Sequence, residues 1–366
     1  MEKKKDKTNR ILQIVGSIKR GSGVANVVFN WHNYIDVSEI QFDYLTFFPL
    51  SENDFDKEII KLGGRIYQLP HPYKYPLKFL LESYRFFKEH HYRVIHSHIT
   101  HLNIFFFPLA KMFGTKNIIQ HSHLTKWSEK KLNGLRNYLM LHAVWPLITH
   151  KMACSYIAGV AYFGKNFTVV NNGIDIEKFI YNRDIRVQKR KELGIENNFV
   201  IGHIGRFSIQ KNHTFLLDIL EILVKIKRET KLVLVGNGPL EEQIDQLVQA
   251  KHLRNNVILL GSRADVSEIY QAFDCFVLPS LYEGLGIVAI EAQATGLPCV
   301  LADTLPKEAF ICNYKKLPLS SAKRWAEEII NFTKDFKRTN TYEQIEEAGF
   351  SAREIAKKIQ KFYFDI

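Results

Sequence analysis

The chain has few cysteines, four in 366 residues, and no two of them form a C-x-x-C pair. Cys154, Cys275 and Cys299 lie in apolar, strand-like runs. We therefore expect reduced core cysteines in a cytoplasmic protein, and neither a disulfide framework nor a cysteine zinc site. The sequence also lacks an uncharged apolar run of roughly 18 residues, which argues against a membrane-spanning helix. The charged start MEKKKDKTNR leads into no apolar stretch, so no signal peptide is expected.

The composition is that of an ordinary globular protein, with 46% hydrophobic and 24% charged residues, and the length suggests two domains. The formal net charge of +12 is unevenly distributed. Residues 1–180 carry 24 Lys and Arg against 14 Asp and Glu, whereas the rest is nearly balanced. A basic first half suits an anionic surface such as a lipid leaflet or nucleic acid, although a diffuse charge that aids solubility gives the same count.

The stretch 76–93 (PLKFLLESYRFFKEHHYR) favours a membrane surface over nucleic acid, because it combines aromatic and basic residues at helical spacing. The predicted apolar face holds Phe79, Leu80, Tyr84 and Phe87, and the basic positions are Lys78, Arg85, Lys88 and Arg93. The alternative is an amphipathic helix whose apolar face packs on its own sheet. That alternative is the simpler explanation of the apolar face alone.

Short apolar runs alternate with helical patterns along the chain. In the first half, the predicted strands are 11–17, 41–48, 65–69, 94–97, 117–121, 152–155 and 168–171, and the main helices are 24–34, 77–89, 102–113 and 128–147. In the second half, the strands are 199–205, 232–236, 257–260, 274–279 and 298–302. This alternation predicts α/β domains with mostly parallel sheets covered on both faces, in which loops at strand ends bind ligands.

A glycine turn follows the first predicted strand. Gly21 and Gly23 lie between that strand and a helix, where backbone N–H groups can approach a diphosphate. The turn lacks the third glycine and the acidic residue about 20 positions later that NAD binding requires.

Two His-x-His pairs end two of the predicted strands. His96 and His98 form one pair, His121 and His123 form the other, and His101 lies near the first. Zinc needs three or four converging ligands, usually with acidic partners behind them. Only clustering in the sequence supports such a site, so we predict no bound metal.

The second half begins after a highly charged segment, 181–193, which places the predicted domain boundary near residue 180. Arg206 and Lys211 are five residues apart in a strand-to-helix loop. Both side chains can therefore face one anion, Arg as a planar fork and Lys as a compact charge. The alternative is a pair of solvated loop cations.

The stretch 274–295 (DCFVLPSLYEGLGIVAIEAQAT) predicts a buried strand, a glycine loop and an apolar helix. Such a loop directs free N–H groups at an anion. Glu283 lies in the loop and Glu291 lies inside the helix; burying them is costly unless ligand hydroxyls pair with them. A glycosidase would need two carboxyls flanking one bond, and this placement better fits two separate parts of a ligand.

These motifs resemble those of the retaining glycosyltransferases of family 4, which have the GT-B fold. The matching segments are 171–175 (NNGID), 205–208 (GRFS), 210–213 (QKNH), 235–239 (VGNGP), 260–263 (LGSR) and the E-x7-E pair of Glu283 and Glu291. The resemblance implies two Rossmann-like domains facing a central cleft. Residues 1–180 would form the acceptor-side domain, 181–345 the nucleotide-sugar domain, and 346–366 a helix that returns to the first domain.

The resemblance also implies roles for individual residues. The catalytic set would be Arg206, Lys211, Glu283 and His121, and the acceptor side would include His98 and His123. The donor would be bound by Gly21, Gly23, Gly205, Arg206, Lys211, Gly236, Gly261, Ser262, Arg263, Glu283, Gly284, Leu285, Gly286 and Glu291. No cofactor or metal is implied.

By the same resemblance, the activity is transfer of a hexose from a nucleotide sugar to a polyprenyl-diphosphate-linked saccharide, in capsular or exopolysaccharide biosynthesis at the inner leaflet of the cell membrane. A UDP-sugar is the expected donor, and GDP-mannose stays open. Nucleic acid is not an expected partner. The alternatives are a nucleotide-sugar epimerase of GT-B shape and a partner subunit that binds nucleotide sugar without catalysis.

Overall fold

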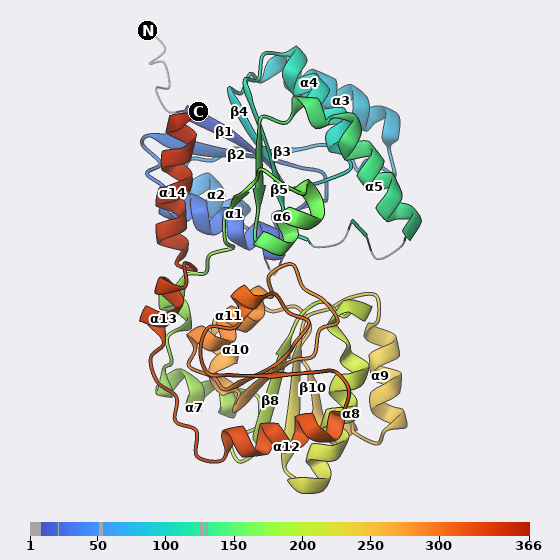
Figure 1. Ribbon diagram of the computed structural model, residues 1–366, viewed down its shortest axis with the longest axis vertical. Coiled ribbons are helices and arrows are strands. Elements are labelled where there is room, and N and C mark those ends of the chain that lie inside the picture. Colours follow the sequence, from blue (N-terminus) through green and yellow to red (C-terminus); the bar gives the residue numbers. More distant parts are fainter. Residues whose placement is uncertain (1–8, 21, 51–53, 125–126, 129–130) are drawn as a thin grey trace. The chain divides into compact units, whose positions relative to one another are not determined.

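The structure, a computed structural model, describes residues 9–20, 22–50, 54–124, 127–128 and 131–366. The chain divides into two compact units (Figure 1). Unit 1 contains residues 1–173 and 351–366, and unit 2 contains residues 174–350. Each unit has its own parallel sheet with helices on both sides. In the described part of the chain, no helix is long and apolar enough to cross a bilayer.

Unit 1 is built on a seven-stranded sheet with the order β3-β2-β1-β4-β5-β6-β7, in which all pairs are parallel. Its strands are β1 (Asn9–Ile14), β2 (Ile40–Thr46), β3 (Ile66–Gln68), β4 (Val94–Ser97), β5 (Asn117–Ser122), β6 (His150–Ala153) and β7 (Thr168–Val169). Its helices are α1 (Gly23–Tyr34), α2 (Asp56–Lys61), α3 (Pro76–Glu89), α4 (Asn103–Met112), α5 (Lys131–Ala143), α6 (Tyr156–Phe163) and α14 (Ala352–Asp365). The central strands are buried on both faces, as expected for parallel sheets between helices.

The last helix of the chain, α14, packs against α1 within unit 1. The hydroxyl of Ser351 accepts a hydrogen bond from the N–H of Glu354 and so caps the helix. Its buried residues Ile355, Ile359 and Tyr363 recur at helical spacing and face the unit. Residues more than 300 positions from β1 therefore complete the core around that strand.

Helix α3 differs from the face predicted for it. Phe79 and Phe87 are buried, but Leu80 and Tyr84 are 40% and 41% exposed. The buried residues of α3 are Phe79, Ser83, Phe86 and Phe87, so the buried face includes Phe86 and excludes Leu80 and Tyr84. The predicted single apolar face is therefore wrong, since half of it packs inside and half faces outward.

Unit 2 repeats the arrangement with a six-stranded parallel sheet in the order β10-β9-β8-β11-β12-β13. Its strands are β8 (Phe199–Ile204), β9 (Thr230–Val235), β10 (Val257–Leu259), β11 (Cys275–Leu278), β12 (Cys299–Ala302) and β13 (Tyr314–Leu317). Its helices are α7 (Arg183–Glu192), α8 (His213–Ile226), α9 (Glu241–Ala250), α10 (Val266–Ala272), α11 (Ile287–Ala294), α12 (Ala322–Thr333) and α13 (Tyr342–Glu347). Cys275 and Cys299 are buried in the central strands, as predicted for core residues.

The strand order reverses once in each sheet, between β1 and β4 in unit 1 and between β8 and β11 in unit 2. At such a point the two loops leave the carboxyl ends of the strands in opposite directions, which opens a crevice where ligands bind. The loop after β8 is 205–212 and the loop after β11 is 279–286. These two loops carry half of the residues predicted to bind the donor.

Gly202 offers a test of the packing in unit 2. A Cβ added there would overlap the ring of the buried Phe273. We expect Gly202→Ala to lower the free energy of unfolding by about 1–3 kcal/mol, because a packed core does not absorb the extra methyl group without strain. Denaturant unfolding measures the change. Gly23→Ala is the control, since nothing lies within 4 Å of its added Cβ; equal midpoints for the two variants would contradict this packing.

Candidate functional site

The loop between β8 and α8 brings the first candidate residues together. A Cβ added at Gly205 would lie 2.9 Å from Cε of Lys211, so the glycine leaves room for the lysine side chain to pass over the backbone. Phe207 is buried, and its N–H donates to the carbonyl of Asn237 (2.9 Å), which anchors the loop. Arg206 is exposed beside this anchor.

Side-chain bonds tie this loop to the loop that follows β11. Lys211 Nζ donates to Glu283 Oε1 at 2.6 Å, and Gln210 Nε2 donates to Glu283 Oε2 at 3.0 Å. Gln210 Nε2 also donates to the carbonyl of Tyr282, and the N–H of Leu281 donates to the carbonyl of Gln210. Glu283 is only 8% exposed, and these bonds offset the cost of removing its charge from water.

Helix α11 begins directly after this second loop. Gly286 has a φ of 81°, in the left-handed region that favours glycine. A Cβ added there would lie 3.6 Å from Cγ of Glu283, so the helix start adjoins the Lys211–Glu283 pair. The N–H groups of a first helical turn lack intrahelical acceptors and carry partial positive charge. Gly284 and Leu285 complete the loop, and Leu285 is buried.

Glu291 lies on α11 with its carboxyl group inside the unit. The hydroxyl of Tyr270 donates to Glu291 Oε2 at 3.0 Å. Burial raises the pKa of Glu291 to about 7, although the Tyr270 hydrogen bond and the charge of Lys211 act in the opposite direction. In the structure, Lys211 therefore pairs with Glu283 beside the start of α11, and its charge also acts on the carboxyl group of Glu291.

The glycines after β9 and β10 support the same edge of the sheet. Gly236 has a φ of 134° and lies against the backbone of Gly205, where a Cβ would overlap the Gly205 carbonyl. Its N–H donates to the carbonyl of Gly261 at 2.8 Å. Gly261 itself has a φ of 63°. Glycine is thus required at position 236 because the Gly205 backbone lies too close for a side chain, and it is favoured at position 261 because φ is positive there.

Arg263 is engaged in an ion-pair network. Its guanidinium donates to both oxygens of Asp265 at 2.8 Å, and Lys189 also pairs with Asp265. These cations hold the pKa of the Asp265 carboxyl well below its usual value. Ser262, next to Arg263, is exposed. Arg263 is thus held by carboxylates, and the structure brings neither residue into contact with the Lys211–Glu283 pair.

In unit 1, the two predicted histidine pairs form one buried cluster. His96 Nε2 lies 3.1 Å from His121 Nδ1, and His98 Nδ1 lies 2.9 Å from His123 Nε2. Burial lowers the pKa of all four imidazoles, that of His123 to about 4. The cluster is therefore neutral near pH 7. His101 lies outside it, with its Nε2 hydrogen-bonded to the hydroxyl of Tyr73.

Ring nitrogens of His96, His98 and His121 lie within 4.8 Å of one another, a spacing from which a metal could be bound. The His96 and His121 rings are nearly coplanar (14°) and meet edge to edge, which is the geometry of an N–H···N hydrogen bond. Among the described residues, the hydrogen-bond partners of these rings are other imidazoles, amides and a phenol, and none is a carboxylate. A divalent ion here would be buried without an anionic ligand. The absence of a metal stays a prediction.

The glycine turn after β1 is only partly described. Gly21 lies outside the described residues. Gly23 is the first residue of α1, and nothing lies within 4 Å of a Cβ added to it.

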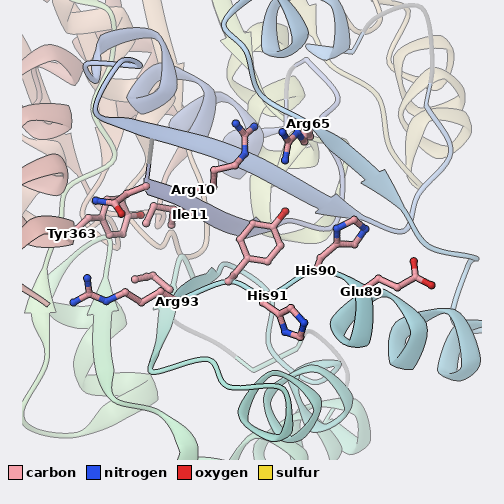
Figure 2. A pocket seen from close by; sticks show the side chains of 11 residues that line it. Arg10, Ile11, Arg65, Glu89, His90, His91, Arg93 and Tyr363 are labelled. Atoms are coloured by element: carbon pink, nitrogen blue, oxygen red, sulfur yellow. The ribbon is translucent and has the colours of Figure 1, made fainter. Parts of the chain in front are cut away.

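A separate cavity of 420 Å³ opens at the amino ends of β1 and β4 (Figure 2). Arg10, Arg65 and Arg93 contribute to its lining. Arg10 donates to Asp43 at 2.8 Å, and Arg93 donates to the carbonyl of Ile366 at 2.6 Å. Since ligands of such sheets bind at the carboxyl ends of the strands, this cavity is not the candidate site.

Sequence reasoning missed several residues that hold candidate residues or their neighbours within each unit, among them Gln210, Tyr270 and Tyr363. Gln210 belongs to a matched segment but had no role assigned, and its amide now proves to hold Glu283. Tyr270 and Tyr363 carry no motif, because each approaches the candidate residues only through the folding of a distant helix.

Three comparisons with known proteins bear on the chain. Residues 185–351 match the family described as "Glycosyl transferases group 1". EpsF of Bacillus subtilis (strain 168), whose name describes it as a glycosyltransferase, is 33% identical over 318 residues, covering 82% of this chain and 80% of EpsF. The Escherichia coli protein named UDP-Gal:alpha-D-GlcNAc-diphosphoundecaprenol alpha-1,3-galactosyltransferase is 28% identical and covers 62% of each chain.

Among solved structures, Anabaena Alr3699/HepE in complex with UDP and glucose superposes with a TM-score of 0.80 at 21% identity, covering 98% of this chain and 100% of HepE. Sucrose-phosphate synthase from Thermosynechococcus elongatus gives a TM-score of 0.78 at 18% identity, covering 98% of this chain. At this level of identity the likeness shows the fold alone.

The buried histidines generate a prediction on pH. In the unfolded chain their pKa is near 6.5, whereas burial lowers it in the folded unit, to about 4 for His123. Below pH 6.5 the unfolded chain therefore binds more protons, and the stability of unit 1 falls as the pH drops from 6.5 toward 4. Each such histidine contributes about 1.4 kcal/mol per pH unit.

Urea unfolding at a series of pH values checks this. His123→Gln should lower the slope of the unfolding free energy against pH by about 1.4 kcal/mol per pH unit, because one proton fewer is taken up on unfolding. His91→Gln is the control, because His91 is exposed. An unchanged slope in His123→Gln would show that His123 does not bind its proton mainly in the unfolded state.

Proposed function

Because the chain belongs to the glycosyl transferases of group 1 and has the GT-B fold, we propose that it is a retaining hexosyltransferase of family 4. Its donor is a UDP-sugar and its acceptor a polyprenyl-diphosphate-linked saccharide, in the assembly of a capsular or exopolysaccharide. The E. coli relative, by its name, transfers galactose from UDP-Gal to a diphosphoundecaprenol-linked sugar. The names of other relatives include capsular polysaccharide biosynthesis glycosyltransferases of Staphylococcus aureus.

The observation that carries this proposal is the junction of the two loops at the β8–β11 strand reversal. Lys211 is fixed there by Glu283, and the start of α11 adjoins the same pair. One N–H of the Lys211 ammonium is used by Glu283, which leaves two for other acceptors. A diphosphate at this junction would meet the Lys211 charge and the free N–H groups of α11 together.

Each residue of the junction has a proposed part in transfer. When the bond from the sugar to the diphosphate breaks, negative charge develops on the leaving oxygens, and Arg206, Lys211 and the α11 amides stabilise it. Glu283 holds hydroxyls of the donor sugar, and Glu291 holds the ribose hydroxyls. By the resemblance, His121 of unit 1 stays a proposed catalytic residue. These cations supply the charge compensation that a metal provides elsewhere, so the reaction proposed is metal-independent.

The proposal is tested first by donor binding. Thermal shift with UDP-glucose, UDP-galactose, UDP-N-acetylglucosamine and GDP-mannose should single out one donor, because a ligand at about 100 times its Kd stabilises the fold by about 2.7 kcal/mol. Transfer of the sugar to a short prenyl-diphosphate-linked acceptor is then measured through the release of the nucleotide.

Arg206→Ala should lower kcat by about 10²-fold, the typical effect of removing one donor to a developing anion. Arg206 is exposed, so its loss should leave the fold intact. Arg228→Ala, just beyond the carboxyl end of α8, removes another exposed arginine and is the matched control. Turnover by Arg206→Ala equal to that of the control would refute the placement of the diphosphate.

The acceptor proposal extends to a membrane surface formed by α3 and α5. Leu77 on α3 and Leu132 on α5 are 82% and 84% exposed. Further exposed apolar side chains on these helices are Leu80, Leu81, Tyr84, Leu135, Tyr138 and Leu139. Between the helices lies an apolar pocket of 220 Å³, to which Phe79 and Met140 contribute.

Basic residues lie on the same two helices, among them Lys78, Arg85, Lys131 and Arg136. Apolar side chains flanked by Lys and Arg match the interface of an anionic leaflet, where the apolar groups enter the lipid and the cations meet the headgroups. We propose that unit 1 rests on the inner leaflet through this surface, where a lipid-linked acceptor is found.

Vesicle sedimentation checks this surface. The protein should bind phosphatidylglycerol vesicles and bind phosphatidylcholine vesicles weakly, and Leu77→Glu combined with Leu132→Glu should reduce binding by at least about tenfold, since two charges would enter the interface. Val187→Glu, at another exposed apolar position, is the control. Equal binding of the double variant and the control would remove this surface from the proposal.

A further inference from the structure

Two hollows of unit 1 adjoin the same loop. This loop, 70–76 (PHPYKYP), leads from β3 into the first residue of α3. The first hollow is the apolar pocket of 220 Å³, which is lined by this loop, by α3 and α5, and by α4 with the residues just before it. The second is a groove of 1360 Å³ between α3 and the edge strand β3. Helix α4 packs against both α3 and α5, so the three helices lie side by side in unit 1 (Figure 1).

The pocket presents hydrocarbon to a ligand. Its apolar lining includes Pro76, Phe79, Leu80, Leu102, Phe105 and Met140. Two polar side chains of the lining bond to each other, since the hydroxyl of Tyr73 lies 2.5 Å from His101 Nε2. Burial lowers the pKa of His101, and the charge of Arg136 acts in the same direction, so this imidazole is neutral near pH 7. The guanidinium of Arg136 donates to Asn137 Oδ1 at 3.0 Å. Water would find few partners in such a pocket, which favours an apolar occupant.

The size of the pocket suits a short piece of hydrocarbon chain. An apolar cavity of about 150 Å³ holds a benzene molecule. By that measure, the 220 Å³ of this pocket hold roughly eight or nine carbon atoms, which is close to two isoprene units. Leu80 and Arg136 line the pocket and are exposed, so the pocket opens at the surface.

The groove has the opposite chemistry. It lies where the chain leaves the carboxyl ends of β2 and β3, the side of a parallel sheet at which ligands bind. Lys74 and Lys78 line it and are exposed, and neither forms an ion pair with a described carboxylate. Arg85, also in the lining, is paired with Glu82. The first turn of α3 contains no acidic residue. The two lysines therefore carry uncompensated positive charge beside the start of α3.

Loop 70–76 is the common wall of the two hollows. His71 and Lys74 face the groove, whereas Pro72 and Tyr73 face the pocket. The ring centroids of His71 and Tyr73 are 5.9 Å apart, so the two hollows are separated by little more than one side chain. His71 Nδ1 accepts the N–H groups of Tyr73 and Lys74, each at 3.3 Å, and three prolines restrict the backbone of the loop. The wall is thus held in place before any ligand binds.

We propose that this part of unit 1 binds the lipid end of the acceptor: the isoprene units next to the diphosphate enter the apolar pocket, and the diphosphate lies in the groove against Lys74 and Lys78. This inference rests on the proposed function and concerns unit 1 alone.

A membrane phospholipid fits the two hollows less well than the acceptor does. The groove, at 1360 Å³, exceeds the roughly 300–1,000 Å³ of common small-molecule sites. It therefore has room for a saccharide beyond the diphosphate, which a small lipid headgroup would leave unfilled. Gln68, Glu82 and Glu89 in its lining offer hydrogen-bonding groups to sugar hydroxyls.

Calorimetric titration of the full-length protein with geranyl diphosphate, which carries two isoprene units, tests the site. Saturating UDP is present to occupy the proposed donor site. We expect geranyl diphosphate to bind at least about tenfold more tightly than inorganic pyrophosphate, because burial of about two methylene groups already gives that factor. Equal affinities would overturn the proposal. Dihexanoyl phosphatidylglycerol should not compete; competition at equal concentration would assign the hollows to bulk lipid and overturn it too.

Two variants locate the ligand. Leu80→Trp should fill the pocket and weaken geranyl diphosphate binding at least about tenfold, and Lys78→Gln should weaken it about fivefold through loss of a charged hydrogen-bond donor. The matched controls are Met112→Trp and Lys111→Gln, at exposed positions of α4 that line neither hollow; both should stay within about twofold of the wild type. Variants of Leu80 and Lys78 that bind as well as these controls would contradict the placement.

Photolabelling of the wild-type protein needs no substitution. A geranyl diphosphate analogue with a diazirine on its chain should label residues within 76–80, 101–105 or 136–140, and labelling confined to other segments would overturn the proposal. The two levels of inference separate cleanly. If the protein transferred sugar but did not bind geranyl diphosphate, this site would fall and the proposed function would stand. If it bound no nucleotide sugar but was labelled in the pocket, the proposed donor would fall and the prenyl-diphosphate site would stand.

Discussion

The ion pair between Lys211 and Glu283 is the interaction on which the candidate site of unit 2 depends. It joins the loop after β8 to the loop after β11, at the point where the strand order reverses. Neither partner is stable alone in this place, because an unpaired charge with so little contact with water is costly. The pair also holds the Lys211 ammonium beside the start of α11. The same contact therefore joins the two loops and places positive charge where an anion would bind.

Much of this arrangement was accessible from the sequence. The alternation of apolar runs and helical patterns predicts two α/β units, and strands such as β4 (Val94–Ser97) agree with the prediction to the residue. The glycines at 205, 236 and 286 mark backbone positions that a side chain would block or strain. Hydrophobic periodicity and glycine positions are local properties of the sequence, so they predict strands, helices and turns without knowledge of distant segments.

Other features were out of reach because they depend on distant segments. The apolar face of α3 was drawn too wide, since only the packed sheet decides which side chains it covers. The pairing of Lys211 with Glu283 spans 72 positions, and that of His96 with Tyr363 spans 267. The sequence around Lys211 does not indicate that Glu283 is its partner, and the sequence around His96 does not indicate Tyr363. Likewise, the two His-x-His pairs in the sequence do not reveal that the rings of His96 and His121 are hydrogen-bonded to each other.

The position of α14 has a consequence for biosynthesis. Unit 2 is one continuous piece of chain, but unit 1 is completed by residues 351–366, which are translated after all of unit 2. Domains generally fold as units during synthesis, so unit 2 has all its residues before unit 1 does. Until residues 351–366 have left the ribosome, the surface of α1 that α14 covers stays open, and unit 1 of the nascent protein depends on the arrival of α14 to close it.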